Sequence, residues 1–157
     1  MKISFVGQKI CFCLKRKIKK AVDVSLKHLG WDSSCVELAI SFLSEEEMRE
    51  LNNRTRNIDK VTDVLSFPNF EIEPFEKINQ DAIIGGKIFL GDMAICLTRA
   101  KEQAEEFGHG LDKEVIKLVI HSVLHMLGFD HIKDEDFEVM SGEEEKIATK
   151  FYTNKKI

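Results

Sequence analysis

Large apolar residues recur along the chain with two different periods. Between Cys35 and Leu43 they occupy every second position, which is the period of a strand that buries one face. Residues 1–6 alternate in the same way, whereas the apolar residues from Phe12 to Leu29 are spaced at helical intervals until Gly30. The chain is therefore expected to begin with a strand, a helix and a second strand.

Cap and turn residues divide the next part of the chain. Ser44 followed by Glu47 is a capping box, which predicts a helix from about Glu45 to Asn53 and a polar loop after it. The segment from Thr62 to Phe67 has strand character and ends at a proline. Residues 69–86 are acidic, contain a proline and end in two glycines, which predicts a surface loop.

Strand character resumes from Lys87 to Cys96, where Gly91 indicates a bulge or the close approach of another backbone. Three helices are expected to follow, over residues 97–107, 112–127 and 134–151. This order predicts the α+β class, with a small mixed four-stranded sheet packed against about five helices. A single domain over residues 1–157 is expected, because no linker or repeat divides the chain.

The composition fits a globular protein with an ordinary core. Of the 157 residues, 43% are hydrophobic and 32% charged, and no apolar run approaches the ~20 residues that span a bilayer. The N-terminus also lacks a hydrophobic segment followed by a small-residue cleavage site. We therefore expect a cytoplasmic protein with no membrane partner.

The net charge narrows the classes of partner that the chain is expected to bind. The net charge of −4 argues against a general polyanion binder, and no DNA partner is expected. The basic cluster from Lys15 to Lys20 either docks phosphates locally or forms the solvated face of a helix. The acidic runs Glu45 to Glu47 and Glu143 to Glu145 fit the first turn and the exposed face of helices.

The four cysteines show neither a CxxC pair nor the spacing of a disulfide framework. They are therefore expected to be reduced and mostly buried: Cys11, Cys13, Cys35 and Cys96.

The stretch HSVLHMLGFDH contains three of the five histidines and is the strongest chemical signal in the chain. His121 and His125 are four residues apart, so their rings lie one turn apart on one helix face and can reach the same ion. Gly128 can end the helix and turn the chain back, which brings His131 toward the other two rings. The surrounding residues make this helix apolar on nearly every side. A lone histidine there would be a hydrogen-bonded core residue, but three at this spacing favour a metal site.

Zinc is the expected ion, one Zn²⁺ per chain, because three imidazoles with an open fourth position form its usual catalytic arrangement. Nickel or cobalt also fits this type of ligand. An open position allows an ion to activate a water molecule near neutral pH, whereas a fourth protein ligand would make the site structural. Asp130 is either an acceptor that orients a ligand histidine or a turn residue.

The spacing His-x3-His-x5-His is also that of the metzincin peptidases, so the metal helix is expected to be zincin-like. In those enzymes a catalytic Glu directly follows the first histidine, and here Ser122 takes its place. A hydroxyl cannot take a proton from water as a carboxylate does, so the peptidase interpretation lacks its essential base.

Four segments together resemble the YbeY-type endoribonucleases, which mature ribosomal RNA in bacteria. They are HSVLHMLGFDH, LNNRTRNIDKVTDVLSFP from Leu51, LGDMAIC from Leu90, and the last helix with Met140 and Glu143 to Glu145. The resemblance implies a single-strand-specific metallo-endoribonuclease that acts in rRNA maturation, at the 3′ end of 16S rRNA, and in ribosome quality control. It also implies that the three histidines bind zinc and that Arg56 faces the RNA phosphate. The implied partners are single-stranded RNA, rRNA and the small ribosomal subunit. The chain differs from the family pattern at Ser122, Val61 and Phe129, where Gly, Pro and Tyr are common.

The residue chemistry of Arg56 agrees with this resemblance, because a guanidinium binds phosphate oxygens through two N–H groups and carries a permanent charge. By position alone it is better explained as a surface arginine in a polar loop. Ser66 and Lys60 are further candidates for RNA contacts, whereas His28 and His109 are interpreted as structural or surface residues, with His109 a candidate to support a ligand histidine. Two other functions stay open: a zinc-stabilised RNA- or ribosome-binding module without turnover, and a zincin-type metallopeptidase.

Overall fold

The computed structural model describes residues 1–78, 83 and 85–153, and its centre is one mixed sheet in the order β1-β2-β4-β3. The first two strands are β1 (Lys2–Gly7) and β2 (Val36–Leu43), which pair in parallel. In turn β2 pairs in parallel with β4 (Ile88–Cys96), and β3 (Val64–Pro68) runs antiparallel to β4 at the edge. The expected mixed sheet of four strands is therefore confirmed.

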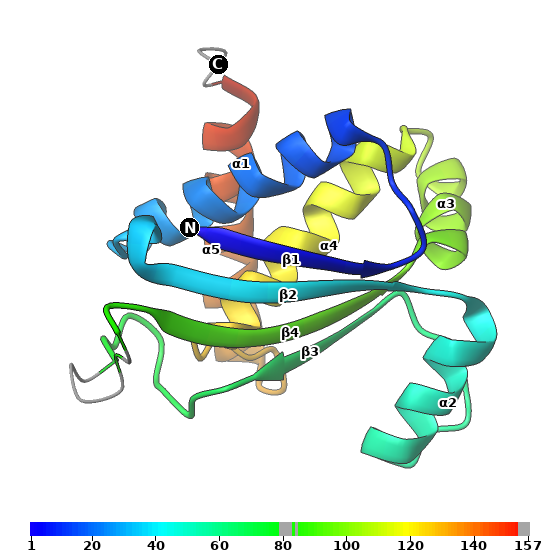
Figure 1. Ribbon diagram of the computed structural model, residues 1–157, viewed down its shortest axis with the longest axis horizontal. Coiled ribbons are helices and arrows are strands. Elements are labelled where there is room, and N and C mark those ends of the chain that lie inside the picture. The colour runs from blue at the N-terminus through cyan, green and yellow to red at the C-terminus, as the bar shows by residue number, and fades with distance from the viewer. Residues whose placement is uncertain (79–82, 84, 154–157) are drawn as a thin grey trace.

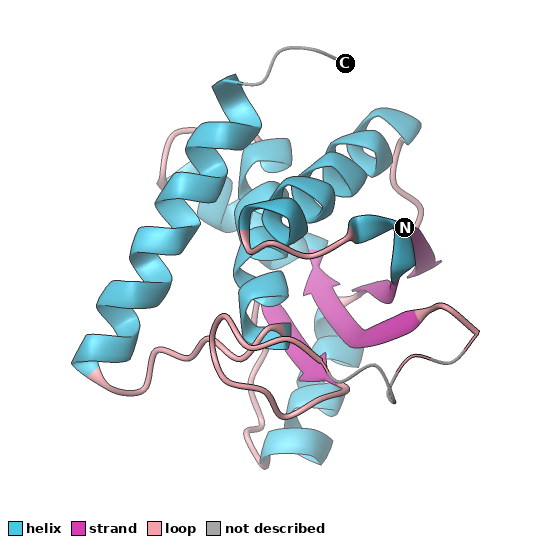
Figure 2. Ribbon diagram, turned by 90° about the vertical axis from the view of Figure 1, so that its left-hand side faces the viewer, coloured by secondary structure: helices cyan, strands magenta, loops and turns pink. Residues whose placement is uncertain are grey.

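Helices cover both faces of this sheet unequally. Figure 1 shows α1 (Phe12–His28), α4 (Leu111–Met126) and α5 (Asp134–Thr153) on one side and α2 (Glu45–Arg56) on the other. The remaining α3 (Leu97–Glu106) follows β4 directly, and a short 3-10 helix, Ser33–Cys35, precedes β2. In Figure 2 the helices lie on either side of the twisted strands. The α+β class with five helices is thus confirmed. No described helix is both long and apolar enough to cross a membrane.

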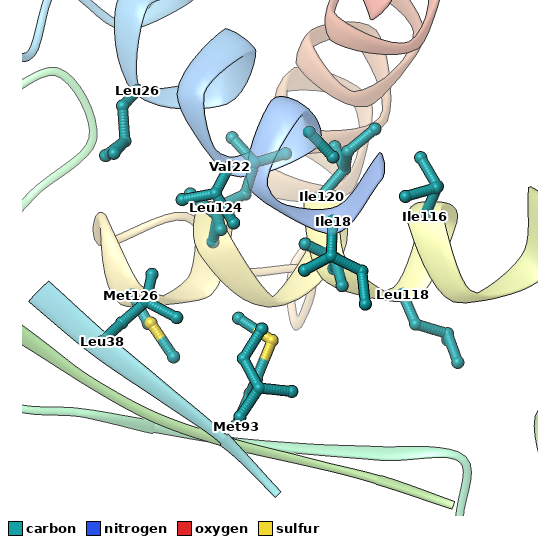
Figure 3. Packing of buried hydrophobic residues seen from close by; sticks show 14 of the residues in the cluster. Ile18, Val22, Leu26, Leu38, Met93, Ile116, Leu118, Ile120, Leu124 and Met126 are labelled. Carbon is teal, nitrogen blue, oxygen red and sulfur yellow. The ribbon is translucent and has the colours of Figure 1, made fainter. Parts of the chain in front are cut away.

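The main core lies between the sheet and the helix pair α1 and α4. The alternate residues of β2 point into it, and its large side chains Leu38, Ile40 and Phe42 are at most 1% exposed. Figure 3 shows Leu38 and Met93 of the sheet facing α4, with α1 packed on the other side of that helix. Because α4 is enclosed by the sheet, α1 and α5, it is apolar around most of its circumference.

Two sequence-based expectations about local structure are wrong. The helix expected to end near Asn53 continues to Arg56, because Asn57 in the left-handed conformation (φ 56°) caps it with its backbone N–H bonded to the carbonyls of Asn52 and Asn53. Arg56 is therefore the last helical residue and not a loop residue.

The second error concerns the cysteines, which are all free as expected but not mostly buried. Cys96 is buried in β4, whereas Cys11 and Cys13 are exposed at the start of α1. Cys11 is the N-cap of that helix, and its sulfur accepts a bond from the Leu14 N–H at 3.4 Å. Its polar role at the helix end explains why it stays outside the core.

The glycine in the middle of β4 has the role that the sequence suggested. Gly91 has φ 144°, and a Cβ there would lie 2.2 Å from the carbonyl oxygen of Phe67 on β3. The pairing of β2 with β4 also shifts register between Glu37 and Ala39, which is the irregularity of a bulge. A side chain at position 91 would therefore push the edge strand β3 away from β4.

Candidate metal centre

Three imidazoles converge at the C-terminal end of α4. His121 and His125 come from successive turns of the helix, and His131 comes from the segment that follows it. One ring nitrogen from each of the three lies within 4.8 Å of the others, so together they could hold a metal ion. The rings of His121 and His125 are half-buried and that of His131 is exposed, so the cluster opens to the surface.

His125 is oriented by a backbone acceptor. Its Nδ1–H donates to the carbonyl oxygen of Phe129 at 2.9 Å, which leaves the unprotonated Nε2 facing the cluster. Burial, together with the neighbouring ring of His121, lowers the pKa of His125 to about 4. This ring is therefore neutral at neutral pH, which is the form that binds metals.

His121 is oriented by a carboxylate on another helix. Its Nδ1–H donates to Oε1 of Glu144, on α5, at 2.5 Å. Its Nε2 then points at Nε2 of His125 across 3.0 Å. With both Nδ1 atoms acting as donors, the two Nε2 atoms are left facing each other. A cation beside them can be bound by both nitrogens, so the donor set fits a metal ion.

A tight turn brings the third histidine to the other two. Gly128 adopts φ 90°, and the Phe129 N–H returns to the carbonyl of Leu124 at 3.1 Å, which ends α4. A Cβ at Gly128 would lie 2.0 Å from the carbonyl oxygen of Ile72, so only glycine lets the loop before β4 approach this turn. Asp130 accepts a bond from the backbone N–H of His131 at 2.7 Å, whereas its distance to the ring is 4.0 Å. Asp130 is thus chiefly a turn residue.

A cavity of about 630 Å³ joins the histidine cluster to the end of α2. His125, Ser66 and Arg56 all line it, although they lie far apart in the sequence. Ser66 also shares a 2.7 Å hydrogen bond with Ser122, which is fully buried and points toward β3. The remaining wall is partly apolar and partly acidic, with Pro68, Phe70, Ile72, Phe129, Glu71, Glu73, Glu76 and Asp130 among its residues.

Arg56 is held in this cavity by the helix that carries it. The buried Met48 and Asn52 anchor α2, and Asn52 Nδ2 donates to the carbonyl of Lys60 at 2.8 Å. Within the described chain, no hydrogen bond or ion pair engages the Arg56 guanidinium, which is exposed. Lys60, the other basic candidate, is not part of the cavity wall.

The remaining histidines lie elsewhere. His28 Nε2 meets the carboxylate of Glu143 at 2.5 Å and joins α1 to α5. His109 Nε2 lies 3.1 Å from the buried carboxylate of Glu114 and does not support a ligand histidine. The basic cluster is also remote, because Lys17 binds Asp112 at the opposite end of α4 from His125, roughly 20 Å along the helix.

Sequence reasoning missed the two groups that orient the rings. The expectation that Glu143 to Glu145 form an exposed face is wrong, since Glu143 is buried and Glu144 holds His121. The one available signal was chemical: a ligand histidine needs an acceptor for its second nitrogen, and acidic residues occur on the last helix. Nothing in the sequence pointed to the carbonyl of Phe129.

Comparison with known proteins identifies the family. The sequence profile of the family described as Endoribonuclease YbeY matches residues 6–152 of the chain. Endoribonuclease YbeY of Caldicellulosiruptor saccharolyticus is 39% identical over 150 residues, which cover 94% of this chain and 95% of that protein. The chain belongs to the endoribonuclease YbeY family. Endoribonuclease YbeY of Clostridium botulinum is 40% identical over 142 residues and 84% of each chain.

A solved structure agrees with this membership. The solution structure of TM1509 from Thermotoga maritima matches with a TM-score of 0.59 and 26% identity, over 98% of this chain and 93% of that one. Membership in the YbeY family supports a nuclease role for the chain and implies an RNA substrate.

Proposed function

We propose that the chain is a single-domain, zinc-dependent endoribonuclease, in which His121, His125 and His131 bind the ion and Arg56 binds the scissile phosphate. The observation that carries the proposal is the pair of imidazole nitrogens aimed at each other across 3.0 Å, in rings whose other nitrogens are already bonded. Arg56, which has no hydrogen-bond or ion-pair partner among the described residues, lines the same cavity as His125. Such an arrangement has a cation site beside a phosphate-binding group.

The donor set favours zinc, while nickel or cobalt fits the same imidazoles. When bound, the ion would supply positive charge and a more acidic water molecule. Among the described residues, these three histidines are the only group of metal-ligand side chains that converges closely enough to hold an ion. Three protein ligands leave a position open, and this favours catalysis over a structural site, which usually has four.

The roles of the surrounding residues follow from their contacts. Glu144 and the Phe129 carbonyl fix which nitrogen of each ring faces the ion, so the site needs little rearrangement on binding. Arg56 would hold two oxygens of the phosphate and stabilise the charge that develops during cleavage. Ser122 cannot act as the carboxylate base of a peptidase, because it is buried and bonded to Ser66.

We infer the biological substrate from the family. It is single-stranded RNA, above all the 3′ end of 16S rRNA on the small ribosomal subunit, in rRNA maturation and ribosome quality control in the cytoplasm. A cavity lined by both Arg56 and His125 supports a single-stranded substrate, since a flexible strand can place its phosphate between these two residues.

The test uses metal-replete protein with unstructured RNA, duplex RNA and casein. Cleavage of the unstructured RNA alone is expected, and a His121→Ala variant purified in the same way should lose it. Loss in that variant excludes a contaminating nuclease. RNA binding without cleavage would replace the proposal with a zinc-stabilised RNA-binding module, and casein digestion that depends on His121 would replace it with a peptidase.

A further inference from the structure

A second cavity lies between α4 and α5, outside the site described above. Its volume is about 400 Å³, and its residues recur at helical intervals on the two helices that face each other. From α4 come Lys113, Ile116, Lys117 and Ile120, and Tyr152 closes it from the end of α5. We refer to it as the α4–α5 cleft.

The two ends of the α4–α5 cleft differ in charge. At the N-terminal end of α4 lie two basic side chains, the exposed Lys113 and the 60% exposed Lys117, whose ammonium contacts the Glu114 carboxylate at 3.4 Å. Glu144 and Glu145 line the opposite end, near the histidines. The aromatic ring of Tyr152, a residue that is 48% exposed, lies at the basic end, and Ile116 and Ile120 form an apolar floor. A cation beside an aromatic ring and an apolar floor matches a nucleotide, which has an anionic phosphate and a flat base.

The α4–α5 cleft is connected to the metal centre by one side chain. Glu144 lines the cleft and also holds His121, whose ring faces His125 in the first cavity. Lys113 precedes His121 by eight residues on the same helix, which is about 12 Å along its axis. A single strand cleaved at the metal centre can therefore extend into the cleft within a few nucleotides.

We propose that the α4–α5 cleft binds a nucleotide of the RNA strand outside the cleavage site, with its phosphate at Lys113 and Lys117 and its base against Tyr152. This inference rests on the proposed nuclease function. It deepens that function by proposing the course of the RNA strand, which runs from the metal centre along α4 into the cleft. The cleft takes single-stranded RNA only, because a paired base cannot reach the floor between the helices.

Tyr152 provides a direct probe because it is the only tyrosine in the chain. Protein labelled with 3-fluorotyrosine gives one ¹⁹F signal, which is followed during titration with a single-stranded 2′-O-methyl 12-mer. A saturable shift of the signal is expected with the single strand and none with a duplex of the same sequence. An unchanged signal under conditions in which the 12-mer binds would overturn the proposal.

Charge variants test the lysines. Lys113→Glu combined with Lys117→Glu should weaken binding of the 12-mer and make its salt dependence shallower by about 0.7 in log–log slope for each lost phosphate contact. The matched control is Lys2→Glu with Lys101→Glu, two exposed lysines that do not line the cleft, with the same change in charge. If the double variant misfolds, Lys113→Glu alone replaces it. This single variant leaves the contact of Lys117 with Glu114 intact and should give half of the slope change. Equal binding by the cleft and control variants would contradict the proposal.

The aromatic contact has its own pair of variants. Tyr152→Ala should weaken binding about fivefold or more, whereas Tyr152→Phe, which keeps the ring, should bind like the parent protein. Cleavage of RNA by the parent protein is measured separately. If the parent cleaves RNA and the cleft variants bind normally, only the cleft proposal fails; if the parent does not cleave, the nuclease proposal itself fails.

Discussion

Two neighbouring glutamates on α5 bind two histidines at the same distance but serve different regions. Glu143 meets His28 on α1 and Glu144 meets His121 on α4, each at 2.5 Å. The His28 pair is nearly enclosed, with both side chains 10% exposed, whereas the His121 pair is about one third exposed. Successive residues of a helix point about 100° apart, so one helix can face two partners in this way.

What separates the two regions is the second nitrogen of each ring. His28 Nδ1 lies 2.7 Å from the Lys150 ammonium, so both of its nitrogens are occupied within the protein. Among the described residues, His121 Nε2 faces the imidazoles of His125 and His131. The arginines of α2 repeat the contrast: Arg49 is bonded twice to Asp59, at 2.7 and 2.9 Å, and Arg56 is left without a partner in the described structure. In these two comparisons, the residue whose polar atoms are satisfied joins parts of the fold, and the residue with open polar atoms is available to a ligand.

The largest expected contrast is in metal content. His125→Ala should lose most of the approximately one zinc ion per chain and all RNA cleavage, because the remaining two ligands no longer enclose an ion. His28→Ala should keep the metal and instead lower the free energy of unfolding by about 1 to 3 kcal/mol, since it leaves Glu143 without its buried partner. Elemental analysis and thermal unfolding measure the two effects. Full metal content in His125→Ala would remove this site from consideration.

The next contrast is between the two arginines. Arg56→Ala should retain the fold and the metal and reduce the cleavage rate roughly 10²- to 10³-fold, as expected for the loss of one preorganised charge donor. RNA binding should change less than the rate. Arg49→Ala should cleave at nearly the parent rate, because its exposed ion pair contributes little. Single-turnover kinetics on unstructured RNA decide between them, and equal rates for the two variants would make Arg56 an ordinary surface arginine.

The smallest contrast is between the two glutamates themselves. Glu144→Gln should weaken metal binding about 10- to 100-fold, because the amide is a poorer acceptor for the His121 Nδ1–H. Glu143→Gln, one residue away, should leave metal affinity unchanged and lower only the thermal stability. Competition with a chelator measures the affinity. If both variants bound metal equally well, Glu144 would not orient the ligand.

Much of the fold was predictable because its patterns are local. The period of two in β2 and the nearly continuous apolar surface of α4 each reflect what their side chains pack against. The end of α2 was not predictable from apolar periodicity, since residues 53–56 are all polar and exposed. Their helical conformation is set by the cap at Asn57.

The candidate site likewise contains residues that the sequence predicts and residues that it does not. The three histidines were recognisable because a helix turn and a glycine place them from the sequence alone. Glu143, Glu144 and Glu145 are the same residue type in sequence. Only the rotation of α5 against α1 and α4 decides which of them is buried, which bonds to His121 and which is exposed to solvent. A contact across the 23 residues that separate His121 from Glu144 leaves no periodic trace in the sequence.

The three proposed metal ligands lie within eleven consecutive residues, whereas Arg56, Ser66 and Glu144 come from distant parts of the chain. A chelating segment this short can bind an ion before the rest of the chain has folded. Metal binding to the unfolded chain reduces the stabilisation that mass action would otherwise give the native state. An ion bound early is therefore expected to speed folding by ordering the end of α4, and to add less equilibrium stability than its affinity for the native site would imply.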